Sequence, residues 1–126
     1  MSAEASGPQI TVLVVDDQAP FRRAARAVLR ETPAFELIAE ATSGEEAVAA
    51  ARELGPDVVL MDVNMPGMGG VEATRCILAA RPETLVVLLS SYEEAPGAAE
   101  GSGAAGYVAK GDFGTRALEE VLRARG

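Results

Sequence analysis

VVLMDVNMPGMGG, residues 58–70, contains the strongest indication of the fold in this chain. Residues 58–61 form an apolar run that is too short for a helix and is typical of a strand buried on both faces of a parallel sheet. The run ends at Asp62, and the Gly- and Pro-rich residues that follow favour a loop over either a helix or a strand. This stretch therefore predicts a buried strand that presents a carboxylate at its carboxyl end.

Three further apolar runs also end at polar residues. They are residues 10–15, followed by Asp16-Asp17; residues 85–89, followed by Ser90-Ser91; and residues 106–109, followed by Lys110. Residues 35–41 alternate like a strand at the edge of a sheet. Because the carboxyl ends of parallel strands lie at one edge of a sheet, we expect the three carboxylates and the lysine to meet there.

Helical patterns separate these runs. The first begins at Pro20 and stops at Thr32-Pro33, and the second begins at a Ser43/Glu46 capping box and stops at Gly55-Pro56. The third covers residues 71–80. The last covers residues 115–125, with Leu118, Val121 and Leu122 inward. Strand and helix alternate along the whole chain. The pattern predicts an α/β fold with a parallel sheet and helices on both faces.

The segment from Glu93 to Gly106 is the exception to this alternation. It should contain the fourth helix, yet it has no apolar side chain larger than Ala, and it contains Pro96 and several glycines. Each interior Gly costs about 1 kcal/mol relative to Ala, and Ala buries little apolar area in return. We expect a short or mobile fourth helix, or else a tolerant surface loop.

Length and composition set the class of protein. A chain of 126 residues is one ordinary domain, and a net charge of -8 argues against a direct grip on nucleic acid or anionic lipid. One cysteine cannot form an internal disulfide, and no apolar stretch approaches the roughly 20 residues that span a bilayer. Residues 1–9 are small and polar, which predicts a disordered tail on a cytoplasmic protein.

The expected cluster of charges has an electrostatic cost. Carboxylates brought to contact distance repel by roughly 4 kcal/mol per pair in a partly screened site. A fold tolerates such a cluster only when positive charge compensates it. A divalent cation and Lys110 are the obvious compensators, so the sequence predicts that both belong to the site.

The motifs VLVVDDQAPFR, VVLMDVNMPGMGG, VVLLSS and GYVAK, taken in this order, resemble the receiver domain of two-component response regulators, nearest the LuxR/NarL type. The resemblance covers residues 10–126. It implies a flavodoxin-like (βα)5 three-layer sandwich with a five-stranded parallel sheet of order 2-1-3-4-5.

The resemblance also implies roles for the residues at the strand ends. Asp62 would be the phosphoacceptor, and Lys110 and Ser90 would contact the phosphoryl oxygens. Mg²⁺, which prefers octahedral oxygen ligands, would be held by carboxylates and one backbone carbonyl. These ligands would be Asp16, Asp17, Asp62 and the carbonyl of Asn64.

A second set of residues would regulate the site. Tyr107 matches the aromatic residue of the family that turns inward when the Ser90 hydroxyl moves toward the phosphoryl group. Asn64, Ser91 and Tyr92 match positions that tune how fast the phosphoryl group is lost.

The function implied is a phosphorylation-controlled switch rather than an enzyme. A sensor histidine kinase would donate the phosphoryl group; the chain contains no His and can only be the recipient. The output would be control of transcription through a DNA-binding domain absent from this chain, with homodimerisation on phosphorylation. A stand-alone single-domain regulator is the alternative.

Three other functions compete with this interpretation. A haloacid dehalogenase-type phosphatase also uses an aspartyl phosphate and Mg²⁺, but it needs a general acid where this chain has Asn64. A flavodoxin-like flavin binder would need a phosphate-cradling loop where Asp16-Asp17 would repel phosphate. A receiver that works constitutively, by contacts alone, would not need the full set of site residues.

Overall fold

Five parallel strands form one sheet in the computed structural model, which describes residues 9–91 and 101–125. The strands are β1 (Ile10–Val15), β2 (Phe35–Ala41), β3 (Val58–Asp62), β4 (Leu85–Ser90) and β5 (Gly106–Ala109). They lie in the order β2-β1-β3-β4-β5, and every neighbouring pair is parallel. The predicted α/β fold and strand order are both confirmed.

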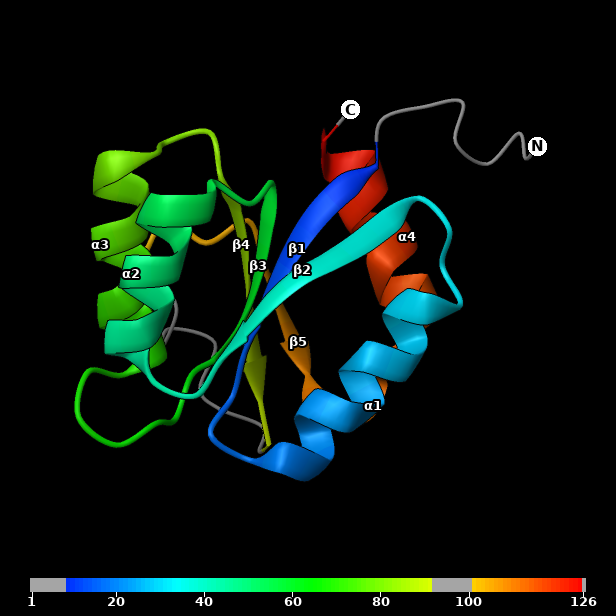
Figure 1. Ribbon diagram of the computed structural model, residues 1–126, viewed down its shortest axis with the longest axis horizontal. Coiled ribbons are helices and arrows are strands. Elements are labelled where there is room, and N and C mark those ends of the chain that lie inside the picture. Colours follow the sequence, from blue (N-terminus) through cyan, green and yellow to red (C-terminus); the bar gives the residue numbers. More distant parts are fainter. Residues whose placement is uncertain (1–8, 92–100, 126) are drawn as a thin grey trace.

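Helices cover both faces of the sheet, as Figure 1 shows. The helices of the described residues are α1 (Ala19–Arg30), α2 (Gly44–Leu54), α3 (Gly70–Ala80) and α4 (Thr115–Arg125). One buried aliphatic cluster lies between the sheet and α1 and α4, and a second lies between the sheet and α2 and α3. None of these helices has the length and apolar character needed to cross a membrane.

The predicted fourth helix falls mainly on residues that the structure does not describe. Of the segment from Glu93 to Gly106, residues 93–100 lie outside the described part, and residues 101–105 contain no helix. The helix labelled α4 is the one predicted over residues 115–125, and its bounds agree with the prediction.

The start and end of α2 follow the predicted capping signals. The Ser43 hydroxyl accepts a hydrogen bond from the Glu46 amide at 3.1 Å, and the Glu46 carboxylate accepts one from the Thr42 amide at 2.8 Å. The return bond therefore reaches the residue before the cap. Gly55 ends the helix with a φ of 58°, a left-handed conformation that Gly adopts without steric cost.

The edge strand β2 departs from simple alternation. Val12 pairs with Leu37 and Leu13 pairs with Ala39, so Ile38 is an extra residue in a β-bulge. Before the bulge, Phe35 and Leu37 pack on the α1 side of the sheet; after it, Ala39 and Ala41 pack on the α2 side. The bulge therefore moves the alternating apolar residues of this strand from one face of the sheet to the other.

Helix α4 buries a narrower stripe than the sequence predicted. Leu118 and Val121 are buried as expected, but Leu122 is 37% exposed, so the prediction that it faces inward is wrong. The adjacent strand β5 lies at the edge of the sheet. Within the described residues, no strand lies beyond β5 for the outer side of α4 to pack against, and Leu122 is left partly exposed.

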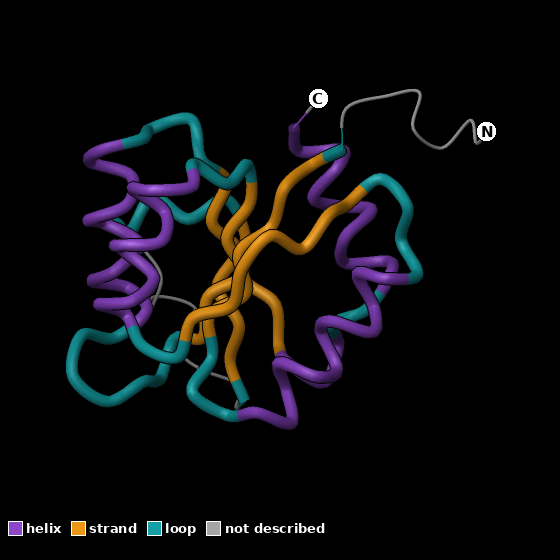
Figure 2. Tube along the Cα trace, viewed as in Figure 1, coloured by secondary structure: helices purple, strands orange, loops and turns teal. Residues whose placement is uncertain are grey.

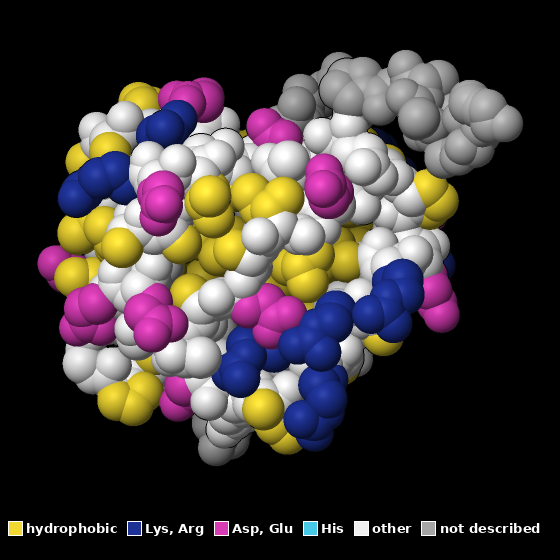
Figure 3. All heavy atoms as spheres, viewed as in Figure 1, with side chains coloured by type: hydrophobic (Ala, Val, Ile, Leu, Met, Phe, Trp, Pro, Cys, Tyr) yellow, Lys and Arg dark blue, Asp and Glu magenta, His cyan; other side chains and the backbone are white. Residues whose placement is uncertain are grey.

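Positive charge gathers along α1. Figure 3 shows basic side chains over this helix, whose basic residues are all Arg, while acidic side chains are spread across the rest of that face. Arg26 forms two hydrogen bonds with Glu40 of β2, at 2.8 and 3.0 Å. The net negative charge of the chain is therefore unevenly distributed, and α1 provides a basic surface.

Close backbone packing sets the start of α3 against the end of β3. A Cβ atom at Gly70 would collide with the backbone carbonyl of Asp62, and the Gly70 amide donates a hydrogen bond to the Val63 carbonyl at 3.0 Å. A Cβ at Gly44 would likewise collide with the carbonyl of Met68. Glycine at these positions allows the loop after β3 to fold tightly below Asp62.

We predict that Gly70→Ala lowers the free energy of unfolding by about 1–3 kcal/mol, because the added methyl group overlaps backbone that cannot move without shifting β3. Gly111→Ala is the control, since nothing lies within 4 Å of its Cβ position. Urea unfolding of both variants tests this prediction. Equal stability of the two variants would show that the close approach is not a constraint.

Candidate functional site

The polar residues at the strand ends lie at one edge of the sheet. Asp16 and Asp17 follow β1, Asp62 is the last residue of β3, Ser90 is the last residue of β4, and Lys110 follows β5. Figure 2 shows the loops after β1 and β3 at the lower end of the view. The sheet therefore brings together groups that are far apart in the sequence.

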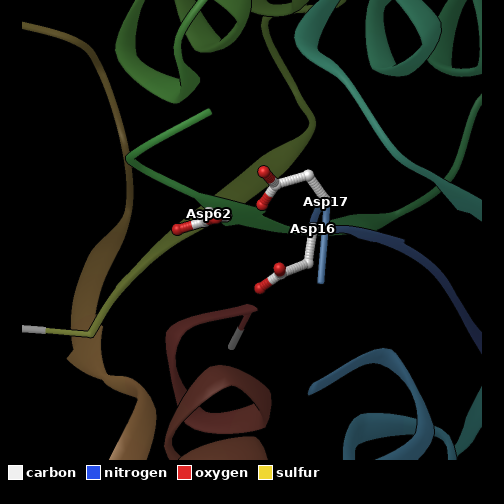
Figure 4. Close-up of side chains that lie close together, drawn as sticks. All are labelled: Asp16, Asp17 and Asp62. Atoms are coloured by element: carbon white, nitrogen blue, oxygen red, sulfur yellow. The ribbon is translucent and has the colours of Figure 1, made fainter. Parts of the chain in front are cut away.

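Three carboxylates form the centre of this edge. One oxygen each from Asp16, Asp17 and Asp62 lies within 4.8 Å of the other two. Figure 4 shows the three side chains close together beyond the ends of β1 and β3. Asp16 is fully buried and Asp62 is 3% exposed, whereas Asp17 is exposed. Two of the three negative charges are thus largely removed from water.

Lys110 supplies positive charge to the buried pair. Its ammonium nitrogen lies 2.5 Å from Oδ2 of Asp16 and 3.6 Å from Oδ2 of Asp62. The lysine side chain is only 11% exposed, so the ion pairs are little screened by water. The structure places this ammonium where it offsets the charge of both buried carboxylates.

Asp16 is fixed by the first turn of α1. Its Oδ1 accepts a hydrogen bond from the Gln18 amide at 2.8 Å, and its backbone carbonyl accepts one from the Arg22 guanidinium at 2.7 Å. Its Oδ2 is buried and accepts no hydrogen bond from the described residues, and the Lys110 ammonium contacts it as an ion pair. One buried carboxylate oxygen therefore still has an unused capacity for a ligand.

The environment of Asp62 favours its protonated form. Burial and the nearby charge of Asp16 raise the pKa of Asp62 from 3.8 to about 6, with Asp17 adding a smaller effect in the same direction. The charge of Lys110 opposes this increase, as does the Asn64 amide, which donates to Oδ1 of Asp62 at 3.3 Å. A cation near Asp62 would remove much of this electrostatic penalty.

The cluster fits a magnesium ion. Mg²⁺ takes oxygen ligands and commonly binds one or two carboxylates together with water. Here three carboxylates converge, two of them are buried, and the buried Oδ2 of Asp16 lacks a hydrogen bond. The Asn64 amide bonds directly to Asp62, so the backbone of Asn64 lies beside the same group.

The remaining predicted site residues occupy different surroundings. Ser90 is fully buried at the end of β4, opposite Ala109 of β5. Tyr107 packs against the core on the α2 and α3 side, and its hydroxyl is buried without a hydrogen-bond partner. Ser91 and the side chain of Asn64 are exposed. Tyr92 lies outside the described residues.

One contact of the site was not predicted from the sequence. The Lys110 ammonium lies 4.9 Å from the centre of the Phe21 ring. Phe21 lies in the first turn of the helix that follows Asp16-Asp17. An aromatic residue in the first turn after an acidic pair was the one sequence feature that could have indicated this contact. Phe21 and Lys110 are far apart in the sequence, so no local pattern connects them.

Comparisons with known proteins identify close similarities. Residues 12–123 match the response regulator receiver domain family. GacA, a response regulator of Pseudomonas aeruginosa, is 44% identical over 117 residues, which cover 91% of this chain and 53% of GacA. The transcriptional regulatory protein DegU of Brevibacillus brevis is 35% identical over 125 residues, covering 98% of this chain and 52% of DegU. The chain therefore spans about half the length of these relatives.

A solved structure agrees with these matches. The signal receiver domain of NarL from Mycobacterium tuberculosis has a TM-score of 0.87 and 31% sequence identity, covering 95% of this chain and 99% of that domain. The resemblance to receivers of the LuxR/NarL type, drawn from the sequence motifs, is confirmed.

Without divalent ions, we predict that Asp62→Asn raises the free energy of unfolding near pH 7.5 by about 3 kcal/mol, the equivalent of a pKa increase from 3.8 to about 6. The folded protein binds the Asp62 proton more tightly than the unfolded chain does. This group therefore lowers stability as the pH rises from about 4 to about 6, and the loss persists above that range.

Urea unfolding as a function of pH measures this effect. The difference between the variant and the wild type should narrow toward pH 4 and vanish below it, where Asp62 becomes neutral in both states of the wild type. Glu83→Gln, which removes an exposed carboxylate outside the site, is the control. An Asp62→Asn variant no more stable than the wild type near pH 7.5 would contradict the prediction.

Proposed function

Since the chain belongs to the response regulator receiver domain family, we propose that it accepts a phosphoryl group on Asp62 from the phosphohistidine of a sensor histidine kinase. The observation that carries this proposal is the setting of Asp62. Its carboxylate ends a buried strand, lies beside two other carboxylates, and has the Lys110 ammonium 3.6 Å away.

The proposed reaction is a nucleophilic substitution at phosphorus. A carboxylate oxygen of Asp62 forms a bond to phosphorus as the phosphorus–nitrogen bond of the phosphohistidine breaks, and the imidazole nitrogen keeps the electron pair of that bond. With a pKa of about 6, Asp62 is mainly ionised near pH 7.5 and can act as the nucleophile. Catalysis then depends on positioning and on neutralising the transferring oxygens.

The acidic cluster would hold the ion that this chemistry needs. Asp16, Asp17, Asp62 and the backbone carbonyl of Asn64 would bind Mg²⁺, with water as the remaining ligands. When bound, Mg²⁺ supplies positive charge that offsets the carboxylates and the transferring oxygens. The buried Oδ2 of Asp16, which accepts no hydrogen bond from the residues that the structure describes and contacts the Lys110 ammonium as an ion pair, supports this assignment.

Two side chains would stabilise the transferred group directly. The Lys110 ammonium, which bridges Asp16 and Asp62, would bind one phosphoryl oxygen as a point charge. The hydroxyl of Ser90, at the end of the strand between β3 and β5, would donate a hydrogen bond to another. Both groups come from the edge of the sheet that carries Asp62.

We propose that the signal passes from Ser90 to Tyr107. A shift of the Ser90 hydroxyl toward the phosphoryl group would change the space beside β5. The Tyr107 hydroxyl is buried there without a hydrogen-bond partner, which costs free energy. A rearrangement that gives this hydroxyl a partner would therefore be favourable. Asn64, Ser91 and Tyr92 would tune the lifetime of the phosphoryl group.

The proposed output is control of transcription. DegU is a transcriptional regulatory protein, and the chain spans 52% of its length. We propose that a DNA-binding domain responds to the receiver, with homodimerisation on phosphorylation. In a stand-alone regulator, the same switch would act on a separate partner protein.

We predict that acetyl phosphate with Mg²⁺ adds one phosphoryl group to the wild-type chain, seen as an increase in intact mass. Asp62→Asn and chelation of the metal with EDTA should each abolish the increase. Lys110→Ala should slow it by about 100-fold or more, as expected when a charge-stabilising donor is lost.

Glu83→Gln is the matched control and should react at the wild-type rate, because its carboxylate is exposed outside the site. An unchanged mass of the wild type would contradict the proposal. Modification that survives in Asp62→Asn would place the phosphoryl group elsewhere.

A further inference from the structure

Phe21 lies under the ammonium of Lys110, with 4.9 Å between the nitrogen and the ring centre. We infer that Phe21 is a positioning residue, whose ring holds this ammonium between Asp16 and Asp62. The relevance of this position to catalysis rests on the proposed function, in which Lys110 binds a phosphoryl oxygen. The contact itself can be tested without phosphorylation.

The ring is held by the helix turn that also fixes Asp16. Phe21 belongs to the start of α1, between Gln18 and Arg22, and these two residues donate hydrogen bonds of 2.8 and 2.7 Å to Asp16. The ring and the Asp16 carboxylate are therefore parts of one unit. The ammonium contacts both, which leaves it little freedom to move toward α1.

A second aromatic residue braces the ring from the lysine's own loop. Phe113 lies with its ring centre 5.8 Å from that of Phe21, at an interplanar angle of 56°. The Phe113 amide donates a hydrogen bond to the Lys110 carbonyl at 3.2 Å, which closes the short 3-10 turn Lys110–Asp112. Lys110 and Phe113 therefore approach Phe21 from one turn of backbone.

An aliphatic side chain could fill this space but could not replace the ring. The face of an aromatic ring carries a negative quadrupole that attracts a cation, and the attraction is stronger where water is excluded. The Lys110 side chain is 11% exposed and its ammonium has three donors to satisfy. The two carboxylates account for part of this need, and the ring face provides a further attractive surface.

The single lysine of the chain gives this contact a unique spectroscopic signal. Protein labelled with ¹³C,¹⁵N-lysine yields one side-chain spin system, and protons over a ring face move upfield through the ring current. We expect the Lys110 Hε protons to be shifted upfield in the wild type. Phe21→Leu should remove the shift, and Phe21→Tyr should retain it.

Phe35→Leu is the matched control for lost core volume. Phe35 is 4% exposed in the core on the α1 side, so this variant loses a buried ring without touching the site. It should lower stability and leave the Lys110 signal and the rate of phosphorylation by acetyl phosphate unchanged. Thermal unfolding shows that each variant is folded at the temperature used.

Phe21→Leu should slow phosphorylation by about 3- to 30-fold, the range that loss of one partly desolvated cation–π contact allows. Phe21→Tyr should restore the rate. An unshifted Lys110 signal in the wild type, or a wild-type rate in folded Phe21→Leu, would overturn the inference. If the wild type takes up no phosphoryl group, the proposed function fails, and the lysine signal alone decides whether Phe21 holds Lys110.

Discussion

The ion pairs that the Lys110 ammonium makes with Asp16 and Asp62 are the interaction on which the site depends. Asp16 and Asp62 are buried and have carboxylate oxygens within 4.8 Å of each other, so their charges would destabilise the fold if nothing compensated them. Burial and the charge of Asp16 raise the pKa of Asp62 to about 6. Lys110 offsets part of this cost from the end of β5. The residual negative charge leaves the site suited to a divalent cation and to a phosphoryl group that arrives with it.

The parallel sheet makes this arrangement possible. Each strand delivers its last residue to the same edge, so charges from three separate segments meet without any long loop having to be ordered. The three central strands β1, β3 and β4 are largely aliphatic and buried, which fixes their register on both faces. Close approach of Gly70 to the backbone of Asp62 then folds the next loop tightly enough to place the Asn64 amide on the Asp62 carboxylate.

The sequence allowed the fold and the members of the charged cluster to be predicted, because strand ends are marked by local patterns. The bulge at Ile38 left no such mark, because residues 35–41 alternate as those of a regular strand would. Contacts between distant segments were equally hidden: nothing local connects Phe21 with Lys110, and the exposure of Leu122 depends on β5 being an edge strand. Roles of Ser90 and Tyr107 came from family resemblance and stay predictions.

Site mapping of the modified residue shows directly whether Asp62 is the phosphoacceptor. Borohydride reduces the acyl phosphate of an aspartate to homoserine, and tandem mass spectrometry of peptides then locates that residue. After treatment with acetyl phosphate and Mg²⁺, we expect homoserine at position 62 alone. Homoserine at position 16 or 17, or at no position in a chain that has gained a phosphoryl group, would contradict this expectation.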